Sequence, residues 1–260
     1  MATTTTDEVL AARAKAADAA MFARAAERVV ALDGASALVH PALPRVIYLN
    51  AVRLEAAMDP DAVEALVERV QAGGPHRRFE VADEALAGRL APVLAARGWE
   101  VGRLLLMGLD GDVPPPEAPE PAEEVPYGHV RGLREEWIRS EPWAAGDEEL
   151  IGQVLAADGR LLTATPTRAF AVFEAGLPVA YCLLLDTGEG AGMVEDVYTT
   201  PSARGRGLAT SVVALALSAS RAEGHDVAFL PTDADRPARA LYERLGFRPL
   251  GLVHQFLRWP

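Results

Sequence analysis

The residues best placed to do chemistry lie in the segment 194–210, VEDVYTTPSARGRGLAT. It opens as an extended, β-branched run that breaks at Pro201, and a helix-periodic apolar stretch begins at Leu208. Between these two parts, Gly205 and Gly207 allow the backbone to turn with its N–H groups pointing outward. The first turn of the following helix adds unpaired N–H donors and a partial positive charge. The segment therefore predicts a strand, an anion-binding turn and a helix.

Two motifs in this part of the chain resemble those of a known superfamily. Arg204-x-x-Gly207-x-Ala209 is similar to the R/Q-x-x-G-x-G/A pyrophosphate loop of the GNAT superfamily of acyl-CoA-dependent N-acyltransferases. Residues 238–247, ARALYERLGF, resemble the late helix A-x-x-L-Y-x-x-L-G-F of the same superfamily, at the usual distance and in the usual order. A basic turn that opens an ordinary strand–helix unit explains the first motif but not the pair. The resemblance covers roughly residues 127–258.

The resemblance implies a fold of the α/β (α+β) class, in which helices flank a mixed, mostly antiparallel twisted sheet. It also implies acetyl-CoA as the co-substrate and no metal ion. The loop would hold the donor through its pyrophosphate, and the backbone of the preceding strand would hold the pantetheine arm and the thioester carbonyl. By this resemblance the donor-binding residues are Val197, Thr199, Arg204, Gly205, Arg206, Gly207, Leu208 and Ala209.

The resemblance assigns the general acid to Tyr242, whose phenol would give a proton to the departing thiolate. The alternative for this residue is a core aromatic on an amphipathic helix. An amine with a pKa of about 10.4 is mostly protonated at neutral pH, so a base or a water relay is useful. Glu195 is the candidate base, and the alternatives are Asp196, a substrate-ammonium contact or a solvated carboxylate. Strand alternation places Glu195 on the face of Val197 and Thr199, and Asp196 on the other face.

Other residues near these motifs have less specific roles. Asp235 stands where the superfamily often has Asn at the start of the late helix, and we expect it to be the N-cap. Cys182 is expected to be a small core residue rather than a nucleophile. Trp137, Arg139 and Trp143 lie in the region that shapes the acceptor pocket in this superfamily, and they either line the pocket or pack in the core.

The composition restricts the classes of partner. With 25 Lys and Arg against 37 Asp and Glu, the net charge is −12, which argues against nucleic acid or an anionic membrane. One cysteine cannot form an intrachain disulfide, and the five histidines lack ligand spacing. We therefore expect no metal site and a reducing, cytoplasmic compartment. The start of the chain lacks a continuous apolar core, and the longest uncharged apolar run is too short for a bilayer, so neither a signal peptide nor a membrane span is expected.

Helix and strand patterns alternate along the chain. Before residue 110 we expect helices at 7–31 (ending at Gly34), 61–71 and 84–96, and extended segments at 46–54, 78–81 and 100–109. Further along we expect a strand at 128–131, helices at 133–139 and 147–156, a hairpin of 169–174 with 178–186, the strand and helix of 194–223, a strand at 227–230, the Tyr242 helix and an extended stretch to Trp259.

The segment 111–126 differs sharply from the rest of the chain. It is rich in proline and acidic residues and contains no lysine or arginine, which is typical of a semi-extended, self-repelling linker. We therefore expect a smaller, degenerate GNAT-like N-terminal lobe at 1–110 and a catalytic GNAT domain at 127–260.

The N-terminal part resembles a degenerate copy of the C-terminal part. Residues 94–99, LAARGW, mirror residues 242–247, YERLGF, so that Leu94 stands where Tyr242 stands, and each segment precedes a strand. Where a phosphate loop should lie, residues 53–60 read RLEAAMDP, with no glycine and with carboxylates that would repel pyrophosphate. Convergent α/β geometry is the alternative explanation. We expect one working site, in the C-terminal half, with the N-terminal lobe as support or as a wall of the acceptor pocket.

The expected function is transfer of an acetyl group from acetyl-CoA to an amine of a small molecule or peptide, by direct attack on the thioester. The alternatives are a non-catalytic acyl-CoA-binding or regulatory module, and an O- or S-acyltransferase that uses the same residues. The acceptor and the oligomeric state carry no motif, and a homodimer is compatible with the chain.

Overall fold

One sheet of eleven strands forms the centre of the molecule. The computed structural model describes residues 2–110, 113–188 and 190–259, with side chains from residue 8 onward. The strands are β1 (Arg28–Leu32), β2 (Ala35–Val39), β3 (Val52–Leu54), β4 (Arg77–Val81), β5 (Glu100–Asp110), β6 (Glu123–Val125), β7 (Thr167–Glu174), β8 (Leu177–Gly188), β9 (Ala191–Thr199), β10 (Val227–Asp233) and β11 (Arg248–Arg258). Their order across the sheet is β1-β2-β3-β4-β11-β5-β10-β9-β8-β7-β6. Only the β3–β4 and β9–β10 pairs are parallel among the described strands, so the sheet is mixed and mostly antiparallel, as predicted.

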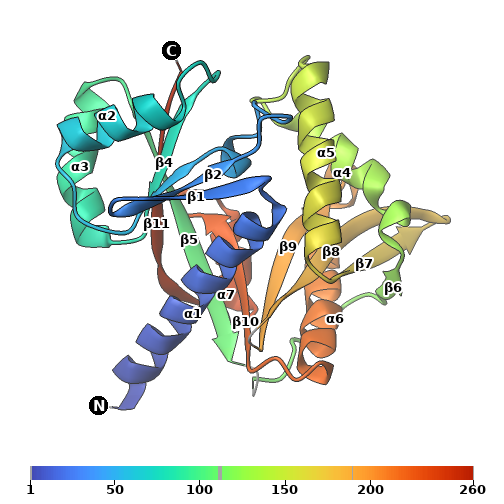
Figure 1. Ribbon diagram of the computed structural model, residues 1–260. Helices are drawn as coiled ribbons and strands as arrows, with labels where there is room; N and C mark the ends of the chain where they lie inside the picture. The colour runs from blue at the N-terminus through green and yellow to red at the C-terminus, as the bar shows by residue number, and fades with distance from the viewer. Residues whose placement is uncertain (1, 111–112, 189, 260) are drawn as a thin grey trace.

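Seven helices among the described residues cover this sheet (Figure 1). They are α1 (Ala2–Ala25), α2 (Pro60–Val70), α3 (Glu84–Ala96), α4 (Arg131–Ser140), α5 (Glu148–Ala164), α6 (Leu208–Ala222) and α7 (Ala238–Arg244). In the C-terminal half, α6 contacts β7, β8 and β9, and its apolar residues form one core with Tyr242. The opposite face carries α1 and α4, whose apolar residues form a second core with β8, β9 and β10. The N-terminal half has its own core, built from α2, α3 and β4.

The two halves exchange their last strands. β5 comes from the N-terminal half but pairs with β10, and β11 comes from the C-terminal half but pairs with β4. β5 and β11 also pair with each other, so the centre of the sheet reads β4-β11-β5-β10. Because Leu105 and Met107 of β5 lie in the C-terminal core and Phe256 of β11 lies in the N-terminal core, each half completes the other.

The internal similarity predicted from the sequence is visible in the helix ends. After α7, the N–H of Leu245 and the N–H of Phe247 both donate to the carbonyl of Tyr242, at 3.1 and 3.0 Å. After α3, the N–H groups of Arg97 and Trp99 donate in the same way to the carbonyl of Leu94, at 2.9 and 3.0 Å. In both places the intervening glycine, Gly98 or Gly246, takes a positive φ that ends the helix.

Three expected elements are wrong. The extended segment predicted at 46–54 is a strand only at Val52–Leu54, because Ile47–Leu49 form a 3-10 helix. The helix predicted at 7–31 ends at Ala25, and residues 28–32 form β1, which turns at Gly34 (φ 67°) into β2. The alanine-rich composition hid this change, because Val29, Val30 and Leu32 fit a helical period as well as a strand. The first strand of the C-terminal half is β6, inside the predicted linker 111–126, and not residues 128–131, which form helical turns. The domain boundaries at 110 and 127 stay a prediction.

None of the described helices combines the length and the hydropathy that a membrane span requires.

Candidate functional site

Strands β9 and β10 open away from each other in the middle of the sheet. They pair in parallel only where Ala191–Met193 faces Val227–Phe229. β10 continues to Asp233 along β5, and β9 continues to Thr199 along β8, but no further β9–β10 pairing is present in the described chain. The β9 backbone beyond Met193 is therefore available on this side to an inserted ligand.

A β-bulge lies at this opening. The register of β9 on β8 shifts between Tyr181 and Leu183, so that Asp196 and Val197 together face Cys182. Asp196 takes a positive φ of 53°, which is uncommon for a residue other than glycine. The bulge breaks the alternation expected from the sequence, and the assignment of faces made there is wrong. Val197 packs against the α6 core, whereas Glu195 and Asp196 both line a cavity on the opposite side.

The turn after β9 has the conformation that its glycines predicted. Gly205 and Gly207 have φ values of 78° and 80°, and Gly207 is the N-cap of α6 without any side-chain cap. The Arg204 guanidinium donates to the Thr199 carbonyl (Nε···O 3.1 Å), and Arg206 pairs with Glu174 (Nη2···Oε1 2.5 Å). Leu208 is buried, and Ala209 follows it in the first turn of the helix. The unpaired N–H groups of this turn can bind a phosphate.

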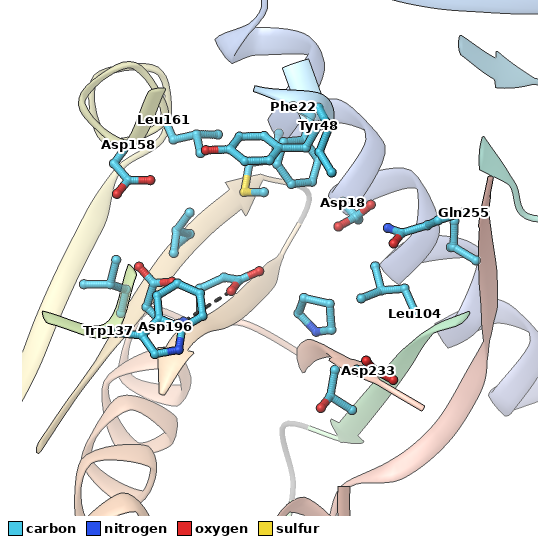
Figure 2. Close-up of a pocket in the computed structure, with 18 of the residues that line it drawn as sticks. Asp18, Phe22, Tyr48, Leu104, Trp137, Asp158, Leu161, Asp196, Asp233 and Gln255 are labelled. Atoms are coloured by element: carbon cyan, nitrogen blue, oxygen red, sulfur yellow. Dashed lines mark hydrogen bonds between the residues drawn. The ribbon is translucent and has the colours of Figure 1, made fainter. Parts of the chain in front are cut away.

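A cavity of about 500 Å³ lies between the two halves. Figure 2 shows its lining, with Asp18 and Phe22 of α1 on one side and Trp137 and Asp196 on another. Strands β4, β8, β9, β10 and β11 and helices α4 and α5 also contribute side chains. The cavity therefore uses the N-terminal half as one of its walls, which is one of the two roles that the sequence left open for that half.

Comparison with known proteins identifies the fold around this opening. Residues 123–247 match the Acetyltransferase (GNAT) family. These residues form a GNAT acetyltransferase domain. A GCN5-related N-acetyltransferase from Kribbella flavida is similar at 25% identity and a TM-score of 0.66, over 95% of this chain and 94% of that one. No curated protein matches this chain.

Two further solved structures show the same fold with less sequence identity. A functionally unknown conserved protein from Staphylococcus epidermidis has 13% identity and a TM-score of 0.70, over 89% of this chain and 94% of that one. A tandem GNAT protein from the clavulanic acid biosynthesis pathway has 16% identity and a TM-score of 0.53, over 80% of this chain and 75% of that one. The chain therefore has a tandem GNAT-like architecture with a degenerate N-terminal half.

In the GNAT domain, one buried arginine holds two of the carboxylates beside the cavity. Arg134 of α4 forms a paired contact with Asp158 (Nε···Oδ2 2.8 Å and Nη2···Oδ1 3.0 Å) and donates to Asp196 (Nη1···Oδ1 2.7 Å). Its guanidinium also lies over the Trp137 ring, 4.5 Å from the ring centre. Burial raises the pKa of Asp196 to about 6, and Arg134 opposes this rise. Because Asp196 is held by this ion pair, it is poorly placed to accept a substrate proton.

Glu195 has no such partner. Among the described contacts its carboxylate accepts only the backbone N–H of Asp196, at 3.2 Å, and no arginine or lysine pairs with it. Burial, followed by the charge of Asp196, raises the pKa of Glu195 to about 8. A carboxylate with a pKa near neutrality can both accept and release a proton at physiological pH. Of the two candidates, Glu195 is therefore the better base.

Tyr242 lies on the other side of the sheet from this cavity. Its ring is 7% exposed, belongs to the α6 core and contacts the Phe247 ring edge-on, with 6.2 Å between ring centres. Burial raises the pKa of the phenol, and the charge of Glu195 contributes to the rise, so the two groups interact through the sheet. The proposed acid and base therefore lie on opposite faces of the sheet.

The remaining predicted residues divide between cavity, core and surface. Trp137 and Trp143 line the cavity, whereas Arg139 pairs with Glu148 at the surface. Cys182 is fully buried in the core, as expected. Asp235 is not an N-cap, because α7 begins after Pro237; the Asp235 carboxylate accepts from Arg103 instead, at 2.5 Å.

Several cavity residues carried no motif in the sequence. Arg134, Asp18, Tyr48 and Glu80 are spread over four elements, and only the fold brings them together. One signal was present: Asp18 interrupts the apolar residues of an alanine-rich helix. A carboxylate in that position points to a buried polar contact.

Proposed function

We propose that this protein is an acetyl-CoA-dependent N-acetyltransferase whose acceptor is a small-molecule amine. The observation that carries the proposal is the opening between β9 and β10, with Glu195 in the cavity on one face of the sheet and Tyr242 in the α6 core on the other. The family of the domain supports acyl transfer from acetyl-CoA, and the acidic lining of the cavity supports an amine as the acceptor.

The residues at the opening fit the donor. The uncapped first turn of α6, with Gly207, Leu208 and Ala209, provides N–H groups for the pyrophosphate, and Gly205 shapes the turn before it. Arg204 and Arg206 add positive charge at the surface of the turn. The backbone of β9 at Val197 and Thr199, which does not pair with β10, would hold the pantetheine arm; the Thr199 carbonyl accepts from Arg204 in this structure. Bound acetyl-CoA supplies the acetyl thioester.

The side chains at the opening supply the proton transfers. Glu195 takes the proton of the attacking amine, as the new N–C bond forms and the C–S bond breaks. Tyr242 gives its proton to the departing sulfur, and the cycle closes when Glu195 releases the amine proton to solvent and the Tyr242 phenolate takes up a proton from solvent. The bulge turns the β9 backbone at Asp196, and the backbone N–H of Val197, the next residue, would be the oxyanion donor to the thioester carbonyl.

The dimensions of the cavity favour a small acceptor over a peptide. At about 500 Å³ it falls within the range that small-molecule sites occupy, roughly 300–1,000 Å³. Its lining contains seven carboxylates and three arginines, which favours a cationic acceptor over a neutral hydroxyl or thiol compound. We expect the reaction to take place in the cytoplasm, without nucleic acid or membrane partners, and a homodimer is compatible with it.

Binding of the donor and turnover test the proposal separately. Acetyl-CoA should raise the melting temperature of the wild-type protein, and Arg204→Glu, an exposed change that reverses one charge of the turn, should remove most of this rise. Gly207→Val should remove it completely, because a Cβ there lies 2.6 Å from Pro119 Cγ and φ is positive. CoA release should then be measured over a panel of amines, alcohols and thiols.

Three outcomes decide between the readings. Release with amines supports the proposal, and release with alcohols or thiols alone supports an O- or S-acyltransferase. A melting shift without any release supports a non-catalytic acyl-CoA-binding module. Absence of a shift with acetyl-CoA and with longer acyl-CoA thioesters contradicts all three readings.

A further inference from the structure

Two of the cavity carboxylates have no ion-pair partner, and they come from opposite halves of the chain. Among the seven, Asp158 and Asp196 share Arg134, and Glu80 is held by Arg53 and Arg78. Glu141 and Asp233 lie within 3.4 and 3.6 Å of the Arg236 guanidinium. This leaves Glu195 on β9 and Asp18 on α1 without a cation among the described residues.

Asp18 is unusual in its position on α1. Leu10, Ala14, Met21 and Ala25 form the buried face of this helix, and Asp18 stands in the middle of that face. Its side chain is 7% exposed, and Oδ1 has no hydrogen-bond partner in the described chain. An unpartnered buried carboxylate costs folding free energy, whereas an alanine or leucine would complete the apolar face. A ligand that hydrogen-bonds to the Asp18 carboxylate would offset this loss of folding free energy.

The orientation of Asp18 fits this explanation. Its carboxylate lines the cavity, and Figure 2 shows it pointing into the space beside Gln255 and Leu104. Burial, together with the charge of Glu80, raises the pKa of Asp18 to about 7, although Arg53 and Arg78 oppose the rise. Those two arginines already donate to Glu80, at 3.2 and 2.7 Å. Both guanidinium groups therefore pair with Glu80, although Arg78 Nε has no hydrogen-bond partner among the described residues.

The rest of the lining specifies what can lie between the two carboxylates. Met21, Leu104, Leu183 and Leu185 present apolar side chains to the same cavity. Two unpaired carboxylates in a cavity that also has apolar lining match a molecule with two ammonium groups joined by an aliphatic spacer. A metal ion fits less well, because the described His, Cys, Asp and Glu residues contain no group of three arranged to hold one.

We propose that the acceptor is an aliphatic diamine, whose distal ammonium binds Asp18 while its other nitrogen lies at Glu195 and is acetylated. This inference rests on the proposed function, since it names the class of acceptor for the same site. Asp18 is a specificity-determining residue in this account. It gives the N-terminal half a direct part in substrate selection, although that half has no donor loop.

Matched amines test the proposal on the wild-type protein. Straight-chain α,ω-diamines of about three to eight carbons should be compared with n-alkylamines of the same carbon number, at saturating acetyl-CoA. The best diamine should exceed its matched monoamine by at least about 30-fold in kcat/KM, because a buried charge pair contributes on the order of 2 kcal/mol or more. Equal kcat/KM values for the two series would overturn the proposal.

The Asp18→Asn variant tests whether the preference for diamines depends on the Asp18 carboxylate. Asp18→Asn should raise the KM of the best diamine by about 30-fold, and it should lower the ratio of diamine to monoamine kcat/KM by a similar factor. The control is Asp233→Asn, which removes a carboxylate of the same cavity that already lies near Arg236. An equal effect of both variants, or an equal effect of Asp18→Asn on diamine and monoamine, would contradict a direct contact. Circular dichroism establishes that each variant is folded.

A binding measurement separates this proposal from the proposed function. Diamine binding to the wild-type protein and to Asp18→Asn should be measured by calorimetry without acetyl-CoA. Diamine binding that Asp18→Asn removes supports the Asp18 contact even if no acetyl transfer occurs. Turnover of monoamines without any preference for diamines supports the proposed function but overturns the Asp18 contact. Failure of every diamine to bind and to react also overturns it.

Discussion

The two halves of the chain place a helix N-terminus at equivalent positions, but they treat it in opposite ways. In the C-terminal half the N-cap of α6 is Gly207, which has no side chain to cap the helix. In the N-terminal half the N-cap of α2 is Asp59, whose carboxylate accepts the N–H of Ala62 at 2.9 Å. The carboxylate occupies the position where a bound phosphate would receive N–H donors. One half leaves its helix terminus open for an anion, and the other supplies the anion itself.

The strands that precede these two helices, β3 and β9, differ in how far they pair with the neighbouring parallel strand. β3 pairs with β4 along its whole length, from Val52 to Leu54. β9 is longer and parts from β10 beyond Met193. Among the described strands, an opening of the kind that we propose for the pantetheine arm therefore occurs only in the C-terminal half. The N-terminal half keeps a structural role, because β5 completes the C-terminal sheet and α1 closes the cavity. Under the proposed function, the N-terminal half lacks a donor site but supplies part of the acceptor site.

Glu195 and Glu80 give the largest expected contrast, since both carboxylates line the cavity but only Glu80 is ion-paired. Glu195→Gln should lower kcat by about 100-fold or more, because it removes the base, and should leave the melting temperature unchanged or higher. Glu80→Gln should destabilise the protein by about 3–5 kcal/mol, since it leaves two buried arginines without their partner. Steady-state kinetics and denaturant unfolding measure the two effects. Similar effects of both changes would contradict the distinction.

Tyr242 and Leu94 occupy equivalent positions and sharpen the comparison further. Tyr242→Phe keeps the ring in the core, so it should lower kcat by about 100-fold without changing acetyl-CoA affinity. Leu94→Ala should cost about 2–5 kcal/mol of stability, because Leu94 is fully buried, and leave the turnover of the folded fraction unchanged. Unaltered turnover in Tyr242→Phe would assign this residue to the core alone.

The pH dependence of stability should also separate the two glutamates. Because the folded state raises the pKa of Glu195 from 4.5 to about 8, Glu195 favours folding below pH 4.5, and this contribution is lost as the pH rises towards 8. Burial alone would raise the pKa of Glu80, but Arg78 and Arg53 hold it below its usual value, so its contribution is lost on acidification instead. Melting temperatures from pH 5 to 9 should therefore fall less steeply in Glu195→Gln than in the wild type. Activity should rise through the same range as Glu195 ionises.

The smallest expected effect concerns the helix cap of the N-terminal half. Asp59→Ala should lower stability by about 1 kcal/mol, because the first turn of α2 loses its capping carboxylate. It should not create a second acetyl-CoA site, because β3 stays paired with β4. Chemical unfolding and acetyl-CoA titration of the variant measure both points. A second binding event in this variant would show that the cap alone had closed the N-terminal half.

The sequence predicted the parts of this molecule that depend on local pattern. Three features could be predicted because each depends on residue types at fixed spacing. They are the Gly205–Gly207 turn, the helix ends that follow Leu94 and Tyr242, and the absence of a phosphate-loop motif at residues 53–60. The exchange of β5 and β11 could not be predicted. The same sequence of hydrophobic residues is compatible with each half keeping its own last strand. The bulge at Asp196 was also missed, because the prediction assumed that side chains alternate strictly between the two faces of the strand, and a bulge adds an extra residue that breaks this alternation. Contacts such as Arg134 with Asp158 and Asp196 link three separate elements and follow only from the assembled fold.

The central claim is that one half of this tandem fold binds the acyl donor and the other does not. Calorimetric titration of the wild-type chain with acetyl-CoA tests it most directly. The account predicts one molecule bound per chain, lost in Gly207→Val and retained in Asp59→Ala. Two molecules per chain, or binding that survives Gly207→Val in a folded protein, would contradict it.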